Sequence, residues 1–212
     1  MNQSEVTRTG GERTSALPLK CGTCAGPLDS PVLCQTCGEL QLNERLSHFE
    51  LLGLPPSFEL DADDLRRRFI QISRKVHPDR LSVADSTAQT AGLRVSAQLN
   101  AAYEILADPL RRAEYLLELS GGSSSAADKS VPQDVLMKSL TQREELEDAR
   151  AAGDESVVAA LRARVAREYE QYCERIFALA RQLPGDEALR KSLRLELNTV
   201  KYYTRFREQA QE

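Results

Sequence analysis

Four of the five cysteines in this chain lie in two pairs whose spacing is that of metal ligands. Two residues separate Cys21 from Cys24, nine residues follow, and Cys34 and Cys37 repeat the first spacing. Each pair can supply two thiolates to one tetrahedral ion, and four thiolates leave no open position for a substrate. The pattern therefore predicts a structural zinc site, and Gly38 suits the tight turn after the second pair. A labile iron–sulfur centre or a redox dithiol is the alternative.

The tripeptide His77-Pro78-Asp79 is the second feature whose residue types could act on a partner. It follows the basic segment LRRRFIQISRKV, and no nucleophile accompanies its histidine and aspartate. It therefore indicates docking, no catalytic residue is predicted, and an enzyme is the least favoured class. His48 is expected to be a packing or surface residue, since no second candidate ligand accompanies it. Cys173 is expected to be a small core or boundary residue.

The residues before the tripeptide have the pattern of an amphipathic helix. Asp61 is a favourable N-cap, and residues 61–76 carry an apolar stripe at helical spacing: Leu65, Phe69, Ile72 and Val76. Three cations lie outside this stripe and are expected to face solvent: Arg67, Arg74 and Lys75. Pro78 ends the helix, because the residue before a proline disfavours helical geometry. Further helices are expected over residues 45–54, 85–107 and 109–119.

The composition changes after residue 119. Residues 120–130, SGGSSSAADKS, have the small polar side chains of a linker. Residues 131–212 contain three helical patterns, which are separated at Gly153 and at Pro184-Gly185. This arrangement predicts a three-helix bundle with short loops, so the chain is expected to be all-α. Residues 1–20 are polar and are expected to form a disordered lead.

The first helix of the expected bundle has apolar residues on two faces. Three of them fall within about 60° of one another at about 100° per residue and should form the buried stripe: Val135, Leu146 and Ala149. Leu136, Met137 and Leu140 lie on a different face, which becomes charged one or two turns later. An apolar patch confined to one helix end indicates a contact site for a partner. The alternative is that the linker or the first helical unit covers it.

Several of these segments resemble a known family. RRRFIQISRKVHPDR, followed by LNAAYEIL, resembles a J-domain. DPLRRAEYLL and LMKSLTQREELED resemble the HscB family of iron–sulfur cluster co-chaperones in particular. The resemblance covers about residues 46–212. It implies a tetracysteine knuckle over 21–40, a J-domain helical hairpin over 44–119, the linker over 120–130, and a scaffold-binding three-helix bundle over 131–212.

The resemblance also implies two partners and the residues that meet them. One partner is a DnaK/HscA-type ATPase chaperone, and the other is the iron–sulfur cluster scaffold protein, of the IscU type. The implied chaperone-binding residues are His77, Pro78, Asp79, Arg67, Arg74 and Lys75. The implied scaffold-binding residues are Leu136, Met137, Leu140 and Tyr202. The chain has Ile70 and Gln71 where some J-domains carry further basic residues.

Composition disfavours some other classes of function. The 212 residues carry a formal net charge of −4, and 41% of them are hydrophobic. An acidic chain with pI about 5.4 is a poor general nucleic-acid binder, which disfavours a zinc-finger protein of that class. No apolar run approaches the length of a membrane span, so no membrane partner is expected. A J-protein that serves another client is the remaining alternative.

The first twenty residues lack the apolar core of a secretory signal, and their two glutamates disfavour a mitochondrial transit peptide. These features predict a bacterial cytoplasmic protein. The tetracysteine resembles eukaryotic family members, which makes the mitochondrial matrix the alternative.

Overall fold

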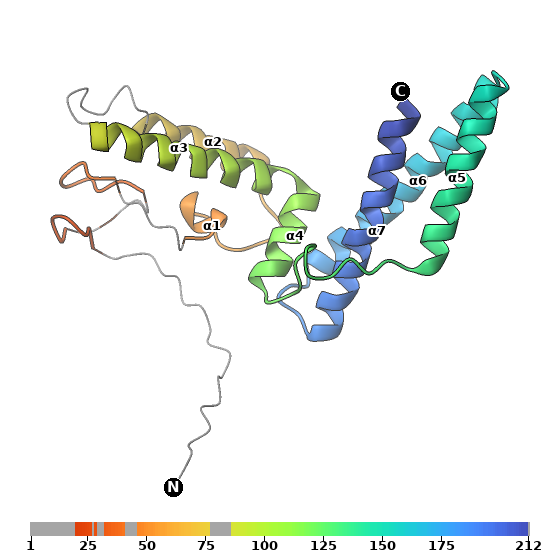
Figure 1. The fold of residues 1–212 in the computed structure, drawn as a ribbon. Coiled ribbons are helices and arrows are strands. Elements are labelled where there is room, and N and C mark those ends of the chain that lie inside the picture. The colour runs from red at the N-terminus through yellow and green to blue at the C-terminus, as the bar shows by residue number, and fades with distance from the viewer. Residues whose placement is uncertain (1–19, 27, 29–31, 41–45, 77–85, 212) are drawn as a thin grey trace, which may run out of the picture. The chain divides into compact units, whose positions relative to one another are not determined.

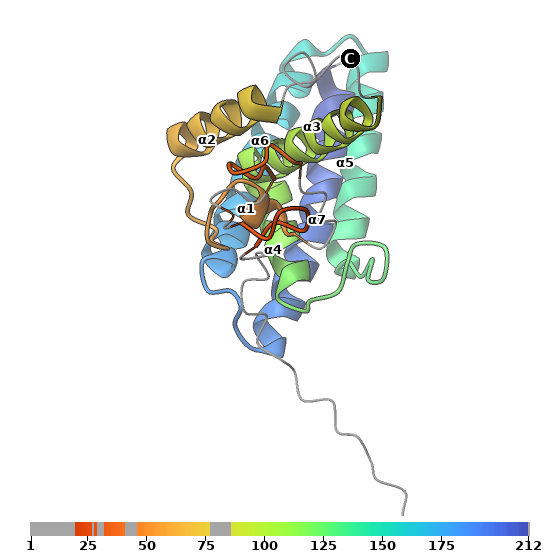
Figure 2. The same ribbon diagram turned by 90° about the vertical axis from the view of Figure 1, so that its left-hand side faces the viewer.

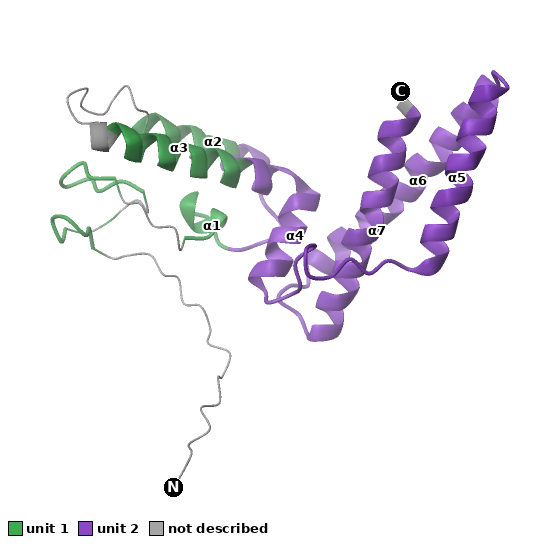
Figure 3. Ribbon diagram, viewed as in Figure 1, with its two compact units in different colours: residues 1–55, 66–103 green, residues 56–65, 104–212 purple. Residues whose placement is uncertain are grey.

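The computed structural model describes residues 20–26, 28, 32–40, 46–76 and 86–211. In these ranges the regular elements are helices, which confirms the all-α prediction (Figure 1). They are α1 (His48–Leu51), α2 (Ala62–Val76), α3 (Ser86–Ala107), α4 (Pro109–Leu119), α5 (Gln133–Ala151), α6 (Glu155–Ala180) and α7 (Glu187–Gln211). The chain divides into two compact units, residues 1–55 with 66–103 and residues 56–65 with 104–212 (Figure 3).

In the first unit, local hydrogen bonds account for where α1 begins and how α2 is tied to it. Ser47 and Glu50 form a capping box, in which each side chain accepts from the other residue's backbone N–H. Gly53 ends this turn with a φ of +64°, a conformation that favours glycine. The Arg68 guanidinium donates to the Gly53 carbonyl over 2.7 Å, which joins the loop after α1 to α2.

The predicted stripe of α2 faces inward, and its two ends are the most deeply buried. Leu65 and Val76 are buried, whereas Phe69 and Ile72 are half-buried. The Phe69 ring stacks on Tyr103 of α3 with centroids 4.5 Å apart, so an aromatic pair takes up the middle of the stripe. The predicted cap is also confirmed, because Asp61 accepts from the backbone N–H of Asp64 over 2.8 Å.

The second unit contains a bundle of α5, α6 and α7, which lie side by side (Figures 1 and 2). The α6–α7 pair has the most extensive packing. The core residues come from all three helices and include the predicted Val135, Leu146 and Ala149. Tyr203 and Phe206 of α7 are buried against them. None of the described helices combines the length and the apolar character that crossing a membrane requires.

A buried ionic network joins α4, the following loop and α7. Arg194, only 1% exposed, donates to Glu114 of α4 over 3.0 Å and to Asn198 over 3.1 Å. The Asn198 amide in turn donates to the carbonyls of Asp128 and Ser130, both at 3.0 Å. Part of the segment predicted as a linker is therefore fastened to α7 by side chains that sequence patterning had not singled out.

The Glu114 carboxylate is the charged centre of this network. It also accepts from Lys201 over 3.1 Å. Burial acts to raise the pKa of Glu114, but the hydrogen bonds and charges of Lys201 and Arg194 outweigh it and lower the pKa. The carboxylate therefore stays ionised, which matches the burial of Arg194 beside it.

Candidate metal centre and docking surfaces

The two cysteine pairs form two knuckles with the same backbone hydrogen bonds. In the first, Cys21 N–H donates to the Gly26 carbonyl over 2.8 Å and Ala25 N–H donates to the Cys21 carbonyl over 2.9 Å. In the second, Cys34 and Gly38 make the corresponding bonds, both at 2.9 Å. The knuckles pack tightly, since a Cβ placed on Gly26 would lie 2.9 Å from the Thr36 hydroxyl oxygen. The two sulfurs of each knuckle therefore face the two sulfurs of the other knuckle.

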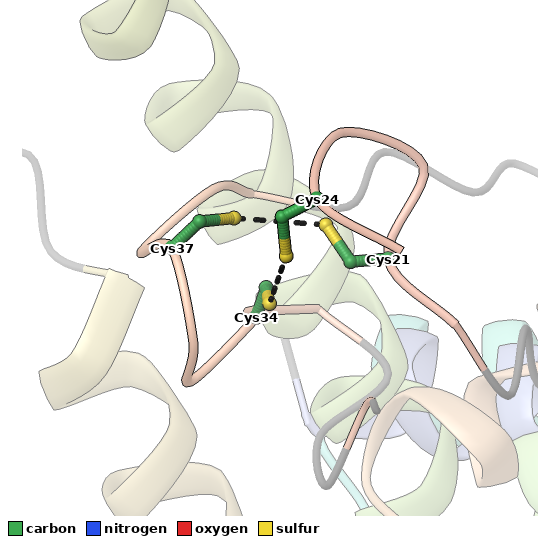
Figure 4. A group of neighbouring side chains, drawn as sticks. All are labelled: Cys21, Cys24, Cys34 and Cys37. Atoms are coloured by element: carbon green, nitrogen blue, oxygen red, sulfur yellow. Dashed lines mark hydrogen bonds between the residues drawn. The ribbon is translucent and has the colours of Figure 1, made fainter. Parts of the chain in front are cut away.

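The four sulfurs form one cluster, as the spacing predicted (Figure 4). All four Sγ atoms lie within 4.8 Å of one another. The pairs across the knuckles, Cys21 with Cys37 and Cys24 with Cys34, are each 3.7 Å apart. A tetrahedral ion with metal–sulfur bonds of about 2.3 Å would separate its ligands by about 3.8 Å, whereas a disulfide requires about 2.0 Å. The donor set and its dimensions therefore fit a tetrahedral metal ion.

The electrostatics of the cluster also favour a bound cation. The backbone N–H groups of Cys24 and Thr23 lower the pKa of the Cys21 thiol to about 6. The Glu39 N–H lowers the pKa of Cys37, but desolvation and the neighbouring cysteine sulfurs outweigh it and raise that pKa to about 12. Adjacent thiolates repel one another, so the four cannot all ionise without a compensating charge. A metal dication supplies that charge and would hold every thiol as a thiolate.

Removal of one ligand should abolish metal binding. We expect Cys34→Ser to lose the bound ion, about one per chain in the unchanged protein, because a neutral hydroxyl cannot replace a thiolate at a four-sulfur site. Elemental analysis of the purified protein by mass spectrometry measures this. Cys173→Ser is the matched control and should retain the metal. Equal metal content in the two variants would contradict the assignment.

The two knuckles differ at one position, which offers a graded test of their geometry. Ala25 has a φ of +56° where the second knuckle has Gly38 at +76°. An L-residue pays about 1–2 kcal/mol for this left-handed conformation. Ala25→Gly removes this strain, but glycine also gives the unfolded chain more conformational entropy, which offsets part of the gain. We therefore expect Ala25→Gly to raise the metal affinity about fivefold, as measured by competition with a chelator.

The reverse substitution is the control for that experiment. Gly38→Ala introduces the same backbone strain, and no atom lies within 4 Å of the new Cβ. Any loss of metal affinity would thus come from the backbone conformation and not from a clash. We expect the two substitutions to change affinity in opposite directions, and changes in the same direction would contradict the conformational explanation.

The predicted chaperone-binding residues are only partly described. His77, Pro78 and Asp79 lie outside the described residues. The cations predicted to accompany them, Arg67, Arg74 and Lys75, are exposed on α2, which ends at Val76 directly before the tripeptide. A basic helical surface therefore leads into the tripeptide along the chain.

The apolar patch on α5 is exposed. The exposed fraction is 37% for Leu136, 59% for Met137 and 54% for Leu140. These values argue against the alternative that the linker covers the patch. The same helix buries a polar residue, because Gln142 is only 3% exposed. The first half of the helix thus buries Gln142 together with Val135, while three large apolar side chains remain exposed, which is unusual for a surface helix.

The remaining predicted contact residue, Tyr202, lies on a second helix. It is half-buried on α7, which packs against α5. Its neighbour Tyr203 is buried in the core of the bundle with Val135 of α5. Tyr202 is therefore held at the surface by the packing of the next residue along the helix.

Two residues singled out as non-ligands have the burial expected of them. Cys173 is half-buried on α6, and desolvation raises the pKa of its thiol above the usual value. It lines a pocket of about 440 Å³ with Leu110, Tyr169 and Phe177. His48 is half-buried in α1, and desolvation lowers the pKa of its imidazole. Neither belongs to the metal cluster.

Models of two domain families match the chain. The DnaJ domain matches residues 47–115, and the HSCB C-terminal oligomerisation domain matches residues 131–211. The two matched ranges include the basic α2 and the apolar patch of α5. The four clustered cysteines lie outside both ranges.

Individual relatives also point to the HscB family. The co-chaperone protein HscB homolog of Vibrio vulnificus (strain YJ016) is 37% identical over 129 residues, which are 60% of this chain and 75% of the relative. The solved structure of chaperone HscB from Vibrio cholerae is 30% identical, with a TM-score of 0.65, and the match covers 78% of this chain and 96% of that one. Human co-chaperone HscB shares the fold, with a TM-score of 0.76 at 23% identity over 91% of this chain and 96% of that one.

Proposed function

This chain belongs to the HscB family of J-domain co-chaperones, and from that membership we propose that it couples two partners. It stimulates the ATPase of a DnaK/HscA-type chaperone, and it delivers to that chaperone an iron–sulfur cluster scaffold protein of the IscU type. The protein itself is a non-enzymatic adaptor that aids cluster transfer.

The observation that carries the scaffold half of this proposal is the exposed apolar patch of α5. Leu136, Met137 and Leu140 expose apolar surface, while Gln142 on another face of the same helix is buried. Keeping large apolar side chains in water costs about 25 cal/mol per Å², so such a patch is a mark of a binding surface. We propose that these residues and Tyr202 contact the scaffold.

The chaperone half rests on the J-domain match and on the charge of α2. His77, Pro78 and Asp79 are proposed to stimulate hydrolysis, with Arg67, Arg74 and Lys75 as electrostatic contacts. If the J-domain binds one chaperone conformation better than another, it shifts the chaperone toward that conformation. Because the same protein delivers the scaffold, the scaffold is close to the chaperone when this change of conformation takes place.

We propose that the clustered cysteines hold one structural zinc ion. Four thiolates saturate a tetrahedral ion, so the ion would order the knuckles and would not bind a substrate. Cys21, Cys24, Cys34 and Cys37 would each supply one Sγ atom. When bound, zinc supplies the positive charge that keeps the four ligands ionised.

The organisation and location of the protein are also part of the proposal. The lead occupies residues 1–20, the metal segment 21–40, the J-domain 44–119, the linker 120–130 and the scaffold-binding bundle 131–212. The bacterial relatives support a bacterial cytoplasmic location. Neither nucleic acid nor a membrane is proposed as a partner.

The decisive experiment measures the ATPase rate of the chaperone encoded in the same genome. The chaperone is assayed alone, with this protein, with the scaffold, and with both. We expect stimulation by this protein and a larger stimulation when the scaffold is added, because both inputs then act on the chaperone together. Stimulation without any scaffold effect would indicate a J-protein for another client. No stimulation in either case would refute the proposal.

A further inference from the structure

The contact between α5 and α6 is polar along the stretch that underlies the apolar patch. Val135 anchors α5 at its first turn, and Leu146 and Ala149 anchor its last turns in the core. Between these anchors, Gln142 is buried. Three helical turns of α5 therefore lie between its apolar anchors, and polar contacts with α6 run along them.

Two of the polar contacts in this stretch are made by one carboxylate of α6. Glu168 of α6 pairs with the Lys138 ammonium over 2.8 Å and accepts from the Gln142 amide over 3.3 Å. The Glu168 side chain is only 17% exposed, compared with 49% for Lys138. Screening by water is therefore reduced on the carboxylate side, which strengthens both contacts relative to a surface pair.

The positions of the two donors on α5 relate Glu168 to the patch. Lys138 lies between Met137 and Leu140 in sequence, and Gln142 lies two residues after Leu140. Because neighbouring positions of a helix move together, fixing the two donors fixes the direction in which the patch side chains point.

Glu168 also faces α7, the helix that carries Tyr202. Burial is the main cause that raises the pKa of Tyr203, and the neighbouring Tyr172 and Glu168 raise it further through charge and hydrogen bonding. The centroid of the Tyr203 ring lies 4.8 Å from that of Tyr172, which places this pair of tyrosines in the α6–α7 contact. The Glu168 carboxylate is thus next to both α5 and α7, the two helices that carry the proposed scaffold contacts.

We infer that Glu168 is a positioning residue for the scaffold-binding surface, holding the first half of α5 in register with α6 and α7. The inference rests on the proposed scaffold-binding role of this surface. The apolar side chains supply the contact with the scaffold, and Glu168 presents them in one orientation. A preorganised surface binds more tightly, because less ordering remains to be done on binding.

The test compares Glu168→Gln with Glu145→Gln in the full chain. Both changes neutralise a carboxylate of the α5–α6 contact, but Glu145 pairs with Arg164 where both side chains are 44% exposed. Titration calorimetry with the cognate scaffold should show a loss of affinity on the order of tenfold for Glu168→Gln, because a neutral amide cannot form the ion pair with Lys138. Glu145→Gln should stay within about twofold, as is usual for an exposed pair.

A second measurement separates positioning from general destabilisation. Hydrogen exchange of the free variant should be faster in residues 136–142 of α5 and unchanged in α6 and α7. Unchanged exchange in α5, or an affinity loss equal to that of the control, would overturn the inference.

The triple change of Leu136, Met137 and Leu140 to Ala distinguishes failure of this inference from failure of the proposed function. If the triple variant weakens scaffold binding and Glu168→Gln does not, the positioning role is wrong and the proposed surface stands. If the triple variant itself leaves the affinity unchanged, the proposed surface is wrong and the positioning role falls with it.

Discussion

Replacement of His77 by Gln should return the chaperone's ATPase to its basal rate while the helices of this protein remain intact. Glutamine keeps a polar side chain but lacks the ring and the titratable nitrogen that the tripeptide presents before Pro78. The tripeptide is proposed to act only through contact with the chaperone, so its loss removes the whole stimulation and not a fraction of it. A steady-state ATPase assay measures the rate, and circular dichroism checks the helical content.

The chain contains one other histidine, which provides a matched control. His48 is half-buried in α1, and His48→Gln makes the same chemical change at a position outside the tripeptide in the sequence. We expect His48→Gln to retain stimulation. Stimulation that survives in the His77 variant would refute the J-domain role of the tripeptide, whatever the control shows.

Simultaneous change of Leu136, Met137 and Leu140 to Ala should weaken scaffold binding by several kcal/mol at most. Truncation of a hot-spot residue costs about 1–3 kcal/mol of binding free energy. A total loss of about 3 kcal/mol raises Kd roughly a hundredfold. Folding should be little affected, because all three side chains are exposed and their removal leaves no cavity. Titration calorimetry with the scaffold measures the change.

A control for this variant is available elsewhere in the bundle. Val157 is an exposed apolar residue near the start of α6, with 41% of its surface accessible. Val157→Ala removes apolar surface outside the patch and should leave scaffold affinity unchanged. If the triple variant binds the scaffold as tightly as the unchanged protein, α5 is not the contact surface.

Much of the fold could be predicted because helix signals are local. The stripe Leu65, Phe69, Ile72 and Val76 and the cap at Asp61 depend on residues within a few turns, and the structure contains the helix they indicate. Helical spacing also separated the buried face of α5 from its exposed patch. The family model for the J-domain then includes the tripeptide that composition alone could only describe as a docking motif.

The polar contacts of the second unit could not be predicted in the same way. A buried Arg194 requires Glu114, which is 80 positions away in the sequence, and Gln142 requires Glu168 on another helix. In the sequence, a polar residue at a core position only interrupts the apolar helical spacing, because its hydrogen-bonding partner lies on another element. Gln142, seven residues after Val135, was the signal that a polar contact lay inside the bundle.

The sequence by itself determined which residues could bind metal, where the long helices lie and which apolar residues of α5 form a patch, because ligand spacing and helical periodicity are properties of neighbouring residues. The helix expected over residues 45–54 is shorter in the structure, where it spans only His48–Leu51 before Gly53 ends the turn. Only the tertiary structure decided that Cys21 faces Cys37 while Cys24 faces Cys34, and that one carboxylate underlies the α5 patch. These pairings join segments that the chain separates. They form because a buried polar or charged group is stable only where folding brings a partner to it.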